Sequence, residues 1–347
     1  MSSEHKYVKA PEQDVVLASR VRIYRNFKDL PFTTRLDSEV SDEIVDRVKT
    51  VMLGGERDGV YTFLKMSDMN DDARGKLLEH DLIDENMLHH ADVGAVLISS
   101  GSTISVMMVG DDHLGIQGRL QGLQSDLAAQ MAYRTEESLS RRFSFAFDSE
   151  WGYLCSNPNL TGTGMRACVL LHLPAITRAG RIADVLQEAG KAGLVLRNTE
   201  GDGRDMGGHL FRLYNQTTLG KSEEDVLASL SATAADIVEK ERMFREAAEK
   251  QDMLRLQDVL LRSCGEVTNS RVLNRREWIR RWSDIRYAVS MGYIHMPLGV
   301  LDELLNETGP ASLQADTNRI LGEREQDILR SAILREKLPA AANEYME

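Results

Sequence analysis

The sequence predicts an α/β or α+β region over its first two thirds and a helical region over its last third. Strand-like runs rich in β-branched and apolar residues alternate with helix-like runs up to about residue 240. The strand-like runs lie at 60–66, 93–100, 103–110 and 167–174, and the helix-like runs at 37–52 and 173–193. From 222 to 263 apolar residues recur every three or four positions, which is typical of amphipathic helices. We therefore expect two domains, 1–240 and 241–347.

The run "AVLISSGSTISVMM" at 95–108 bears on how the strands pair. Two strand-like halves are joined by Ser-Gly, which is typical of a β-hairpin. A hairpin favours an antiparallel sheet over a doubly wound parallel one.

Composition limits the classes of partner. The chain has 347 residues, 42% of them hydrophobic, and a formal net charge of -12. It is long enough to bury a large core, but as a whole it repels nucleic acid and anionic membranes. Any bound anion must therefore be bound by a local group of arginines.

Because no apolar run approaches the roughly 20 residues of a membrane span and the first residues lack a signal-peptide core, we expect a cytoplasmic protein without membrane contact. Three widely spaced cysteines suit neither disulfides nor a zinc site.

The glycine-rich stretch 155–166, "CSNPNLTGTGMR", has the outline of a phosphate-binding loop. Residues 162–167 match the dinucleotide pattern G-x-G-x-x-A, but a strand-like run follows them where that motif requires a helix. A P-loop is excluded because no Gly-Lys-Ser/Thr occurs in the stretch. An ordinary glycine turn before a strand that begins near Arg166 remains the alternative.

Arginines in three separate stretches suggest an anion site. Arg20 and Arg22 lie two apart in a strand-like run, so their side chains fall on one face. Arg166 follows the glycine-rich stretch, and Arg197 ends another strand-like run. Guanidinium groups match phosphate oxygens in bidentate fashion, so a polyphosphate suits such a group. A solvated edge strand and surface loops are the alternative interpretation.

Several motifs, in the right order over almost the full length, resemble those of the phosphagen (guanidino) kinase family. They are "SRVR", "DDHLGIQ", "WGYL", "NPNLTGTGMRA", "LHLPAI" and "RNTEGDGRD". The run "LYNQTTLGKSEEDVL" is most similar to bacterial protein-arginine kinases of the McsB type. The resemblance implies an antiparallel sheet flanked by helices, followed by a helical dimerisation domain, and phosphoryl transfer from ATP with Mg²⁺ to arginine side chains.

The resemblance also implies roles for individual residues. Those at ATP-binding positions are Ser19, Arg20, Arg22, His80, Arg166 and Arg197, and those at catalytic positions are Asp111, Asp202 and Asn157. Two carboxylates are needed because a guanidinium with a pKa above about 12 is a poor nucleophile unless it is aligned and loses a proton. No resident protein metal site is expected.

The chain departs from the family pattern at the expected site. Asp111 and Asp202 stand where the family has glutamates, which shortens each side chain by one methylene. Gly115 replaces a phosphate-binding arginine, and Arg119, on the same face if the strand continues, is a possible substitute. Asn157 replaces the family's reactive cysteine, while Cys155 lies two positions upstream.

The C-terminal third contains "QDILRS" at 326–331, the best match to the R-D-x-x-R-A motif with which bacterial protein-arginine kinases sense phosphoarginine. Asp327 and Arg330 would lie on one helix face, where a structural pair is the alternative. The resemblance further implies a homodimer, a McsA-type zinc-binding activator, a Clp ATPase partner and a role in stress response. Two other functions remain open: a catalytically degenerate regulator that binds nucleotide or phosphoprotein, and a kinase of a small guanidino metabolite.

Overall fold

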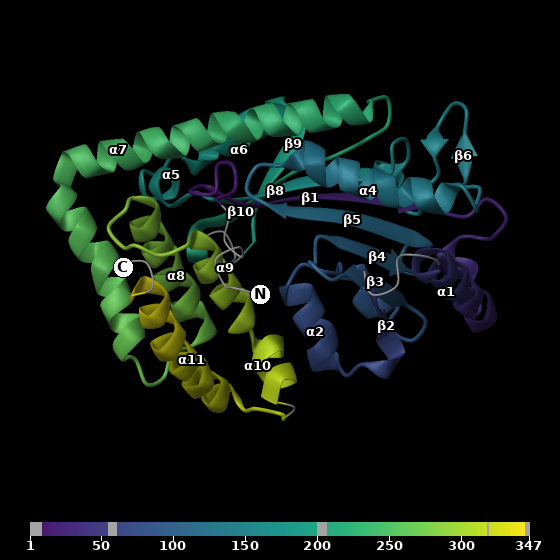
Figure 1. Ribbon diagram of the computed structural model, residues 1–347. Coiled ribbons are helices and arrows are strands. Elements are labelled where there is room, and N and C mark those ends of the chain that lie inside the picture. Colours follow the sequence, from purple (N-terminus) through teal and green to yellow (C-terminus); the bar gives the residue numbers. More distant parts are fainter. Residues whose placement is uncertain (1–8, 55–60, 200–206, 318, 344–347) are drawn as a thin grey trace.

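The computed structural model describes residues 9–54, 61–199, 207–317 and 319–343, and its centre is one large antiparallel sheet (Figure 1). In spatial order the strands are β2 Tyr61–Lys65, β3 Ala95–Ser99, β4 Ile104–Met108, β5 Leu114–Gln121, β1 Val16–Arg25, β8 Met165–His172, β10 Leu210–Asn215 and β9 Leu194–Asn198. The short strands β6 Phe147–Asp148 and β7 Gly152–Tyr153 form a separate pair. The predicted 95–108 hairpin is present as β3 and β4. The α+β class with antiparallel pairing is therefore confirmed.

Helices cover both faces of the sheet and extend beyond its end. Those of the first two thirds are α1 Ser38–Leu53, α2 Asp71–Glu79, α3 Asn86–His89, α4 Ser125–Ser140, α5 Pro174–Arg178 and α6 Ile182–Lys191. The last third contains α7 Glu223–Asn269, α8 Arg275–Ser290, α9 Leu298–Glu307, α10 Pro310–Thr317 and α11 Glu323–Asn343. Short 3₁₀ turns lie at Thr33–Arg35, Met66–Asp68, Pro158–Leu160 and Gly207–His209.

The two faces of the sheet are filled differently. Val21 and Ile23 of β1 point to one face, where they join apolar cores built with α1, α4, α5, α6 and the first half of α7. On the other face, α2 and α3 pack over β3 and β4, and α8, α9 and α11 form a core with Leu210 of β10. Between these two groups of helices the second face of β1, β5 and β8 carries polar side chains. The expected site lies on this part of the sheet.

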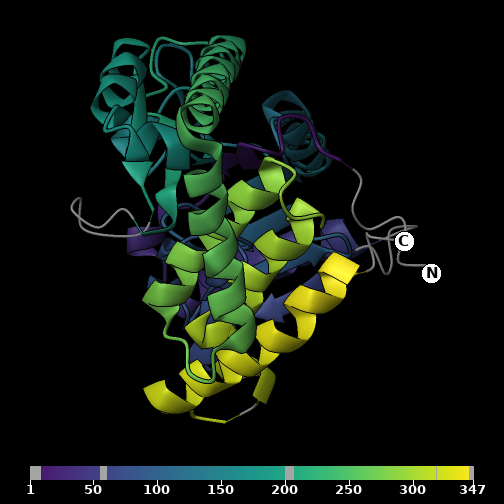
Figure 2. The ribbon, with the colours of Figure 1, turned by 90° about the vertical axis from the view of Figure 1, so that its left-hand side faces the viewer.

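The long helix α7 links the sheet region to the C-terminal helices. It begins at a capping box between Ser222 and Asp225 and bends at Asp252, whose φ of -160° and ψ of 82° are not helical. Its second half packs with α8 and α11 (Figure 2). Because α7 is continuous through residue 240, the boundary between 1–240 and 241–347 stays a prediction. The helix-like run expected at 173–193 is helical but consists of two helices, because a turn with Gly180 at φ 70° divides it into α5 and α6.

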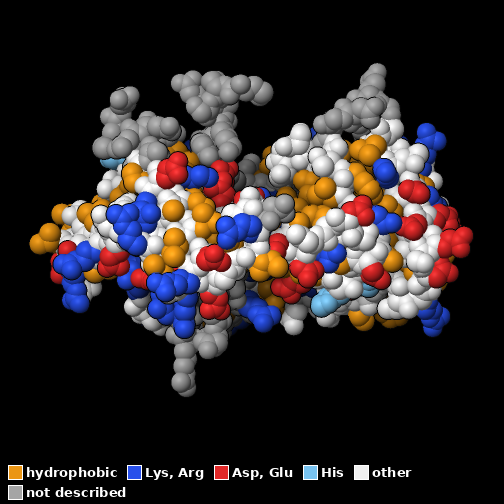
Figure 3. All heavy atoms as spheres, turned by 90° about the horizontal axis from the view of Figure 1, so that it is seen from below, with side chains coloured by type: hydrophobic (Ala, Val, Ile, Leu, Met, Phe, Trp, Pro, Cys, Tyr) orange, Lys and Arg blue, Asp and Glu red, His pale blue; other side chains and the backbone are white. Residues whose placement is uncertain are grey.

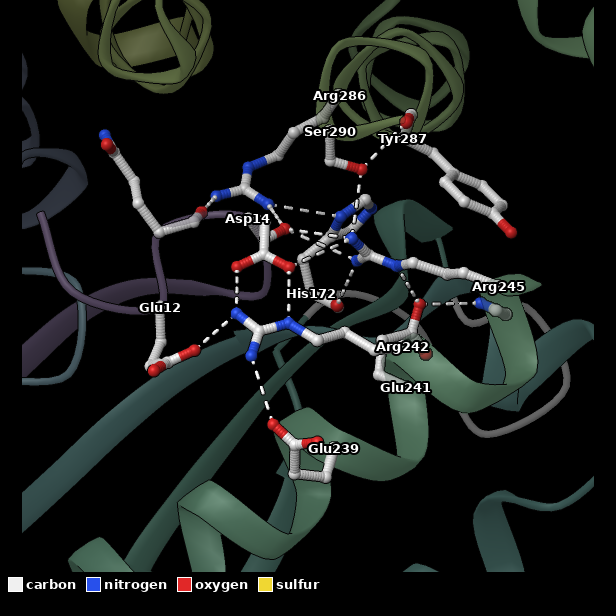
Figure 4. A network of polar contacts seen from close by, with 12 residues as sticks. Glu12, Asp14, His172, Glu239, Glu241, Arg242, Arg245, Arg286, Tyr287 and Ser290 are labelled. Atoms are coloured by element: carbon white, nitrogen blue, oxygen red, sulfur yellow. Dashed lines mark hydrogen bonds and ion pairs between the residues drawn. The ribbon is translucent and has the colours of Figure 1, made fainter. Parts of the chain in front are cut away.

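A partly buried network of charged side chains joins the N-terminal segment, β8, α7 and α8 (Figure 4). Glu241 of α7, fully buried, accepts hydrogen bonds from the first backbone amides of α5 and from Arg245. Arg242 forms ion pairs with Asp14, and Arg286 of α8 donates to the carbonyls of Gln13 and Asp14. Burial raises the pKa of Glu241, which these donors oppose. The network ties the helical third to the sheet.

Arg245→Met is expected to destabilise the protein by about 3–5 kcal/mol, because it leaves the Glu241 carboxylate buried without its partner. Urea unfolding followed by circular dichroism measures the change. The matched control on the same helix is Lys250→Met, which breaks an exposed pair with Glu246 and should cost less than about 1 kcal/mol. Equal effects of the two substitutions would show that the network contributes no more than a surface ion pair.

Candidate active site on the arginine face

Six arginines lie on one face of the central strands, which we call the arginine face. They are Arg20, Arg22, Arg119, Arg166, Arg197 and Arg212. The pairing register shows why they gather. Arg20 is opposite Arg119 in β5, and Arg22 is opposite Arg166 in β8. Arg212 of β10 is opposite Leu170 in β8 on one side and opposite Arg197 in β9 on the other. Alternation along each strand then places all six side chains on the same side.

The predicted arginines therefore come from separate segments but share one surface. Arg20, Arg22 and Arg166 lie on neighbouring strands, while Arg197 lies at the sheet edge and is exposed. The Nε atoms of Arg20 and Arg119 are buried and lack a hydrogen-bond partner among the described residues. A buried donor without an acceptor costs about 1–3 kcal/mol. This arrangement favours an anionic ligand with several oxygens.

Asp81, in the connection after α2, lies against this group of arginines. Its carboxylate forms an ion pair with Arg20 and lies 3.8 Å from Arg22 Nη2 and 3.6 Å from Arg119 Nε. Burial alone would raise the pKa of Asp81, but Arg20, Arg22, Arg119 and Arg212 outweigh it and lower the pKa. Asp81 is therefore held ionised, and the carboxylate occupies part of the surface that the sequence predicts for phosphate.

The lowered pKa of Asp81 sets a pH dependence of stability. A carboxyl with a lower pKa in the folded state stabilises the fold above its unfolded pKa of about 3.9, and this contribution is lost as pH falls through the folded pKa. We expect wild-type protein to be more stable than Asp81→Asn at pH 6 and the difference to shrink below about pH 4. Melting temperatures measured from pH 6 to pH 3 test this. A difference that stays constant over the range would contradict the assigned ionisation.

Tyr24 and Asp84 extend the polar surface beside Arg22. Tyr24 lies two residues after Arg22 in β1 and donates to Asp84 Oδ2 at 3.1 Å. Burial, together with Asp84, raises the pKa of Tyr24 to about 12, so the phenol keeps its proton. Arg22 also donates to the Ile83 carbonyl at 3.0 Å. The segment after α2 thus covers the arginine face with several oxygen acceptors.

Asp111 and Asp112, after β4, form the acidic corner next to this face. The Asp111 side chain is 48% exposed and its Oδ1 lies 3.3 Å from His90 Nε2. Asp112 is buried and accepts from Asn26 Nδ2 at 2.6 Å and from the Ser156 amide at 2.7 Å. Burial raises the pKa of Asp112 although these donors oppose it. Asp111 therefore faces outward, while Asp112 accepts hydrogen bonds that join the segments of this corner.

His113 fixes the strand end behind the two acids. Its Nδ1 accepts from the Phe27 amide at 2.9 Å, and its Nε2 lies 2.8 Å from the Pro31 carbonyl, so Nε2 carries the proton. Burial lowers the pKa of His113, which keeps it neutral. His113 is therefore a structural residue, whereas Asp111 is available to a ligand.

The glycine-rich stretch is packed against the acidic corner and β1. The Ser156 hydroxyl donates to the Asp111 carbonyl at 2.7 Å, which places the neighbouring Asn157 beside that corner. The Asn157 side chain is exposed and accepts from the Asn159 amide. Burial raises the pKa of Cys155 to about 12, so it is a thiol and cannot replace a reactive thiolate. Gly164 has φ 66°, and a Cβ there would lie 2.6 Å from the buried Arg25 guanidinium.

Family models match both parts of the chain. The C-terminal catalytic domain of the ATP:guanido phosphotransferases matches residues 42–244, and the C-terminal domain of the protein-arginine kinase McsB matches residues 253–347. A protein-arginine kinase of Geobacillus sp. (strain WCH70) is 35% identical over 340 residues, which cover 97% of this chain and 94% of the relative. The chain belongs to the protein-arginine kinase family of ATP:guanido phosphotransferases.

Two further comparisons agree with this family. A protein-arginine kinase of Bacillus cereus (strain AH820) is 36% identical over 336 residues, 96% of this chain and 95% of the relative. The duplicated taurocyamine kinase from Schistosoma mansoni, solved with bound transition state analog components, superposes with a TM-score of 0.58. It is 22% identical, and the match covers 71% of this chain and 36% of that one, so this likeness shows the fold alone.

The structure does not bring every predicted residue of the family site to the arginine face. Ser19 lies on the opposite face of β1, is fully buried, donates to the Gly122 carbonyl and accepts from the Gln124 amide. It joins β1 to the start of α4 instead of facing a nucleotide. His80 caps α2, and burial lowers its pKa; the neighbouring Asp81 reaches the arginines. Asp202 lies outside the described residues.

Asp327 and Arg330, the predicted phosphoarginine-binding pair, lie one turn apart in α11. Arg330 is 1% exposed and donates to the carbonyls of Thr308 and Leu273 at 3.0 and 2.8 Å, and to Asp327 at 2.6 Å. Burial lowers the pKa of Arg330, which Asp327 opposes. These contacts favour a structural role that joins α11 to neighbouring loops, and recognition of phosphoarginine stays a prediction.

Sequence reasoning missed the acids that face the arginines. Asp81 and Asp84 lie in "EHDLIDEN", where acidic residues are read as an exposed loop. Arg212 was missed because only the pairing of β9 with β10 brings it opposite Arg197 on this face. Tyr24 could have been found from the sequence, because it lies two positions after Arg22 and period-2 alternation places it on the arginine face.

Proposed function

We propose that this chain is an ATP-dependent protein-arginine kinase, which transfers the γ-phosphoryl group of ATP to arginine side chains of proteins. The arginine face carries this proposal, because four arginines predicted from distant segments share one surface beside Asp111. The relatives named protein-arginine kinase support the substrate class. ATP binds with its phosphates on Arg20, Arg22 and Arg166, and Arg197 reaches them from the edge strand.

The roles of these residues follow from phosphoryl-transfer chemistry. The enzyme must position the γ-phosphoryl group and neutralise its charge, which guanidinium groups and the Mg²⁺ of the nucleotide complex accomplish. Arg119 supplies the charge that is missing at Gly115. Asp111 and Asp202 align the substrate guanidinium, and one of them accepts its proton as the P–N bond forms. Asn157 donates a hydrogen bond to the acceptor.

The magnesium ion enters as part of the nucleotide substrate. Mg²⁺ is usually held by substrate phosphates with one or two carboxylates and several waters. The described residues contain no group of three His, Cys, Asp or Glu side chains able to hold a metal.

The wider setting also belongs to the proposal. The described part of the chain includes no helix with the length and apolar character of a membrane span. We place the enzyme in the cytoplasm as a homodimer, with a McsA-type activator and a Clp ATPase that degrades arginine-phosphorylated proteins under stress. Lys and Arg side chains gather over the C-terminal helices in the view from below (Figure 3), although the net charge of the chain is -12.

The test is to incubate purified protein with MgATP and an unfolded arginine-rich protein, and to search for acid-labile phosphoarginine by mass spectrometry. Phosphoarginine that depends on Asp202 is the expected result, with Asp202→Asn as control. ATP binding without any phosphoarginine would instead favour a degenerate regulator, which Gly115, Asn157 and the shortened acids motivate. Phosphorylation of free arginine but of no protein would favour a metabolite kinase.

A further inference from the structure

The segment Glu79–Asp84 connects two parts of the molecule that are far apart in the sequence. At one end Asp81 contacts the arginine face, as described above. At the other end Glu79 contacts α10 of the C-terminal region. Only one residue separates these two acids, so a movement of one must displace the other.

The contact at Glu79 is specific. Its Oε1 accepts from the Ala311 amide at 3.0 Å, and its Oε2 accepts from the Ser312 amide at 2.9 Å and the Ser312 hydroxyl at 2.7 Å. These amides belong to the first turn of α10, whose orphan N–H groups and dipole favour a carboxylate. A Cβ at Gly309 would lie 2.2 Å from Glu79 Oε2, so only glycine leaves room for this carboxylate.

Neighbouring contacts align α2 with α10 along their length. Gln314 donates to Asp72 Oδ1 at 2.8 Å, and Lys76 forms an ion pair with Asp316. A Cβ at Gly75 would lie 2.7 Å from the Ala311 methyl group, which shows how closely the helices approach. The two helices lie beside each other below the sheet, where α2 of the sheet region meets α10 of the C-terminal region (Figure 1).

The backbone at Asp81 is held in one conformation. Asp81 has φ 58°, which an aspartate adopts only at some cost. Its carbonyl accepts from Gln117 Nε2 at 2.8 Å, and its amide donates to the Leu78 carbonyl at 2.9 Å. Together with the contacts of Glu79, these bonds compensate the strain and direct the Asp81 carboxylate at Arg20.

We infer that Asp81 competes with the phosphates of the nucleotide for Arg20, Arg22 and Arg119, and that the docking of α2 on α10 holds it there. The C-terminal region thereby sets the affinity of the arginine face for ATP. This inference rests on the proposed function, since it assumes that the arginine face is the nucleotide site. The carboxylate already pairs with Arg20 and lies against Arg22 and Arg119, so a phosphate that binds at these same N–H donors requires Asp81 to move away.

The expected size of the effect follows from population arithmetic. When only a fraction of molecules has Asp81 displaced, the apparent Kd equals the intrinsic Kd divided by that fraction. A displaced fraction of about 10% therefore weakens apparent affinity about tenfold. Removing the charge of Asp81 abolishes the competition.

The experiment is calorimetric titration of the full chain with MgATP. Asp81→Asn should bind ATP about tenfold more tightly than wild type, although its own melting temperature is lower without nucleotide. Glu79→Gln should also bind more tightly, by a smaller factor. In the double variant, Glu79→Gln should add nothing further, because it acts through Asp81. The matched control is Glu85→Gln, which removes an exposed charge from the same connection and should leave the Kd unchanged.

Each outcome decides a different claim. Unchanged or weaker binding by Asp81→Asn, with measurable binding by wild type, overturns the competition and leaves the proposed nucleotide site intact. A tightening in Asp81→Asn without any in Glu79→Gln overturns the role of α10. If neither wild type nor Asp81→Asn binds ATP, the nucleotide site itself is refuted and the inference with it. Should Asp81→Asn not fold, Glu79→Gln, which retains every arginine contact, decides the competition by whether it tightens binding.

Discussion

Arg166→Ala is expected to reduce the ATP-dependent formation of phosphoarginine about 100- to 1,000-fold. Arg166 is opposite Arg22 across β1 and β8, and its guanidinium lies 5.3 Å from the centre of the Tyr214 ring. Two charge-assisted hydrogen bonds to phosphate, at about 1.5–2 kcal/mol each, account for a loss of this size. Because Arg166 makes no contact with Asp81 that the structure records, the substitution leaves that ion pair in place.

Initial rates at several ATP concentrations measure this loss, and circular dichroism verifies that the variant is folded. Arg141→Ala is the matched control, since Arg141 is 73% exposed and pairs with Glu137 one turn away. It should retain wild-type activity. Equal activity of the two alanine variants would remove Arg166 from the nucleotide site.

Asp111→Asn is expected to lower the rate of transfer about 100- to 10,000-fold, the usual contribution of a positioned acid–base group. The amide cannot accept the guanidinium proton and cannot balance its charge. ATP affinity should stay unchanged, because Asp111 lies beside the arginine face instead of on it. Single-turnover rates and nucleotide titration measure these two quantities separately.

Asp111→Glu separates charge from reach. It restores the residue that the family pattern has at this position and keeps the carboxylate, so it should retain more activity than Asp111→Asn by at least about tenfold. If the asparagine variant is as active as wild type, Asp111 is not a catalytic residue. If the asparagine variant loses ATP affinity as well, Asp111 also belongs to the nucleotide-binding part of the site.

The fold and the arginine face could be predicted because their signals are local or periodic. Strand alternation places Arg20 and Arg22 together, and the hairpin at 95–108 fixes the antiparallel class. Arg119 was predicted to lie on the same face as Gly115 if its strand continued, and the register of β5 places it opposite Arg20.

The position of Ser19 and the role of Asp81 could not be predicted in the same way. Ser19 was assigned to the nucleotide on the strength of its motif, although alternation places it on the face opposite Arg20. Asp81 was overlooked because Arg20 and Arg119, which its carboxylate faces, lie 61 and 38 positions away along the chain and meet it only through tertiary packing. A residue whose role depends on a left-handed backbone and a docked helix has no signature in a linear motif.

The central claim is that the arginine face holds the triphosphate of ATP beside Asp111. A crystal structure with Mg²⁺ and a non-hydrolysable ATP analogue tests it most directly. The account predicts phosphate oxygens within hydrogen-bond distance of Arg20, Arg22 and Arg166, with the γ-phosphate directed toward Asp111. A triphosphate bound to other residues, with these three guanidinium groups untouched by it, would contradict the account.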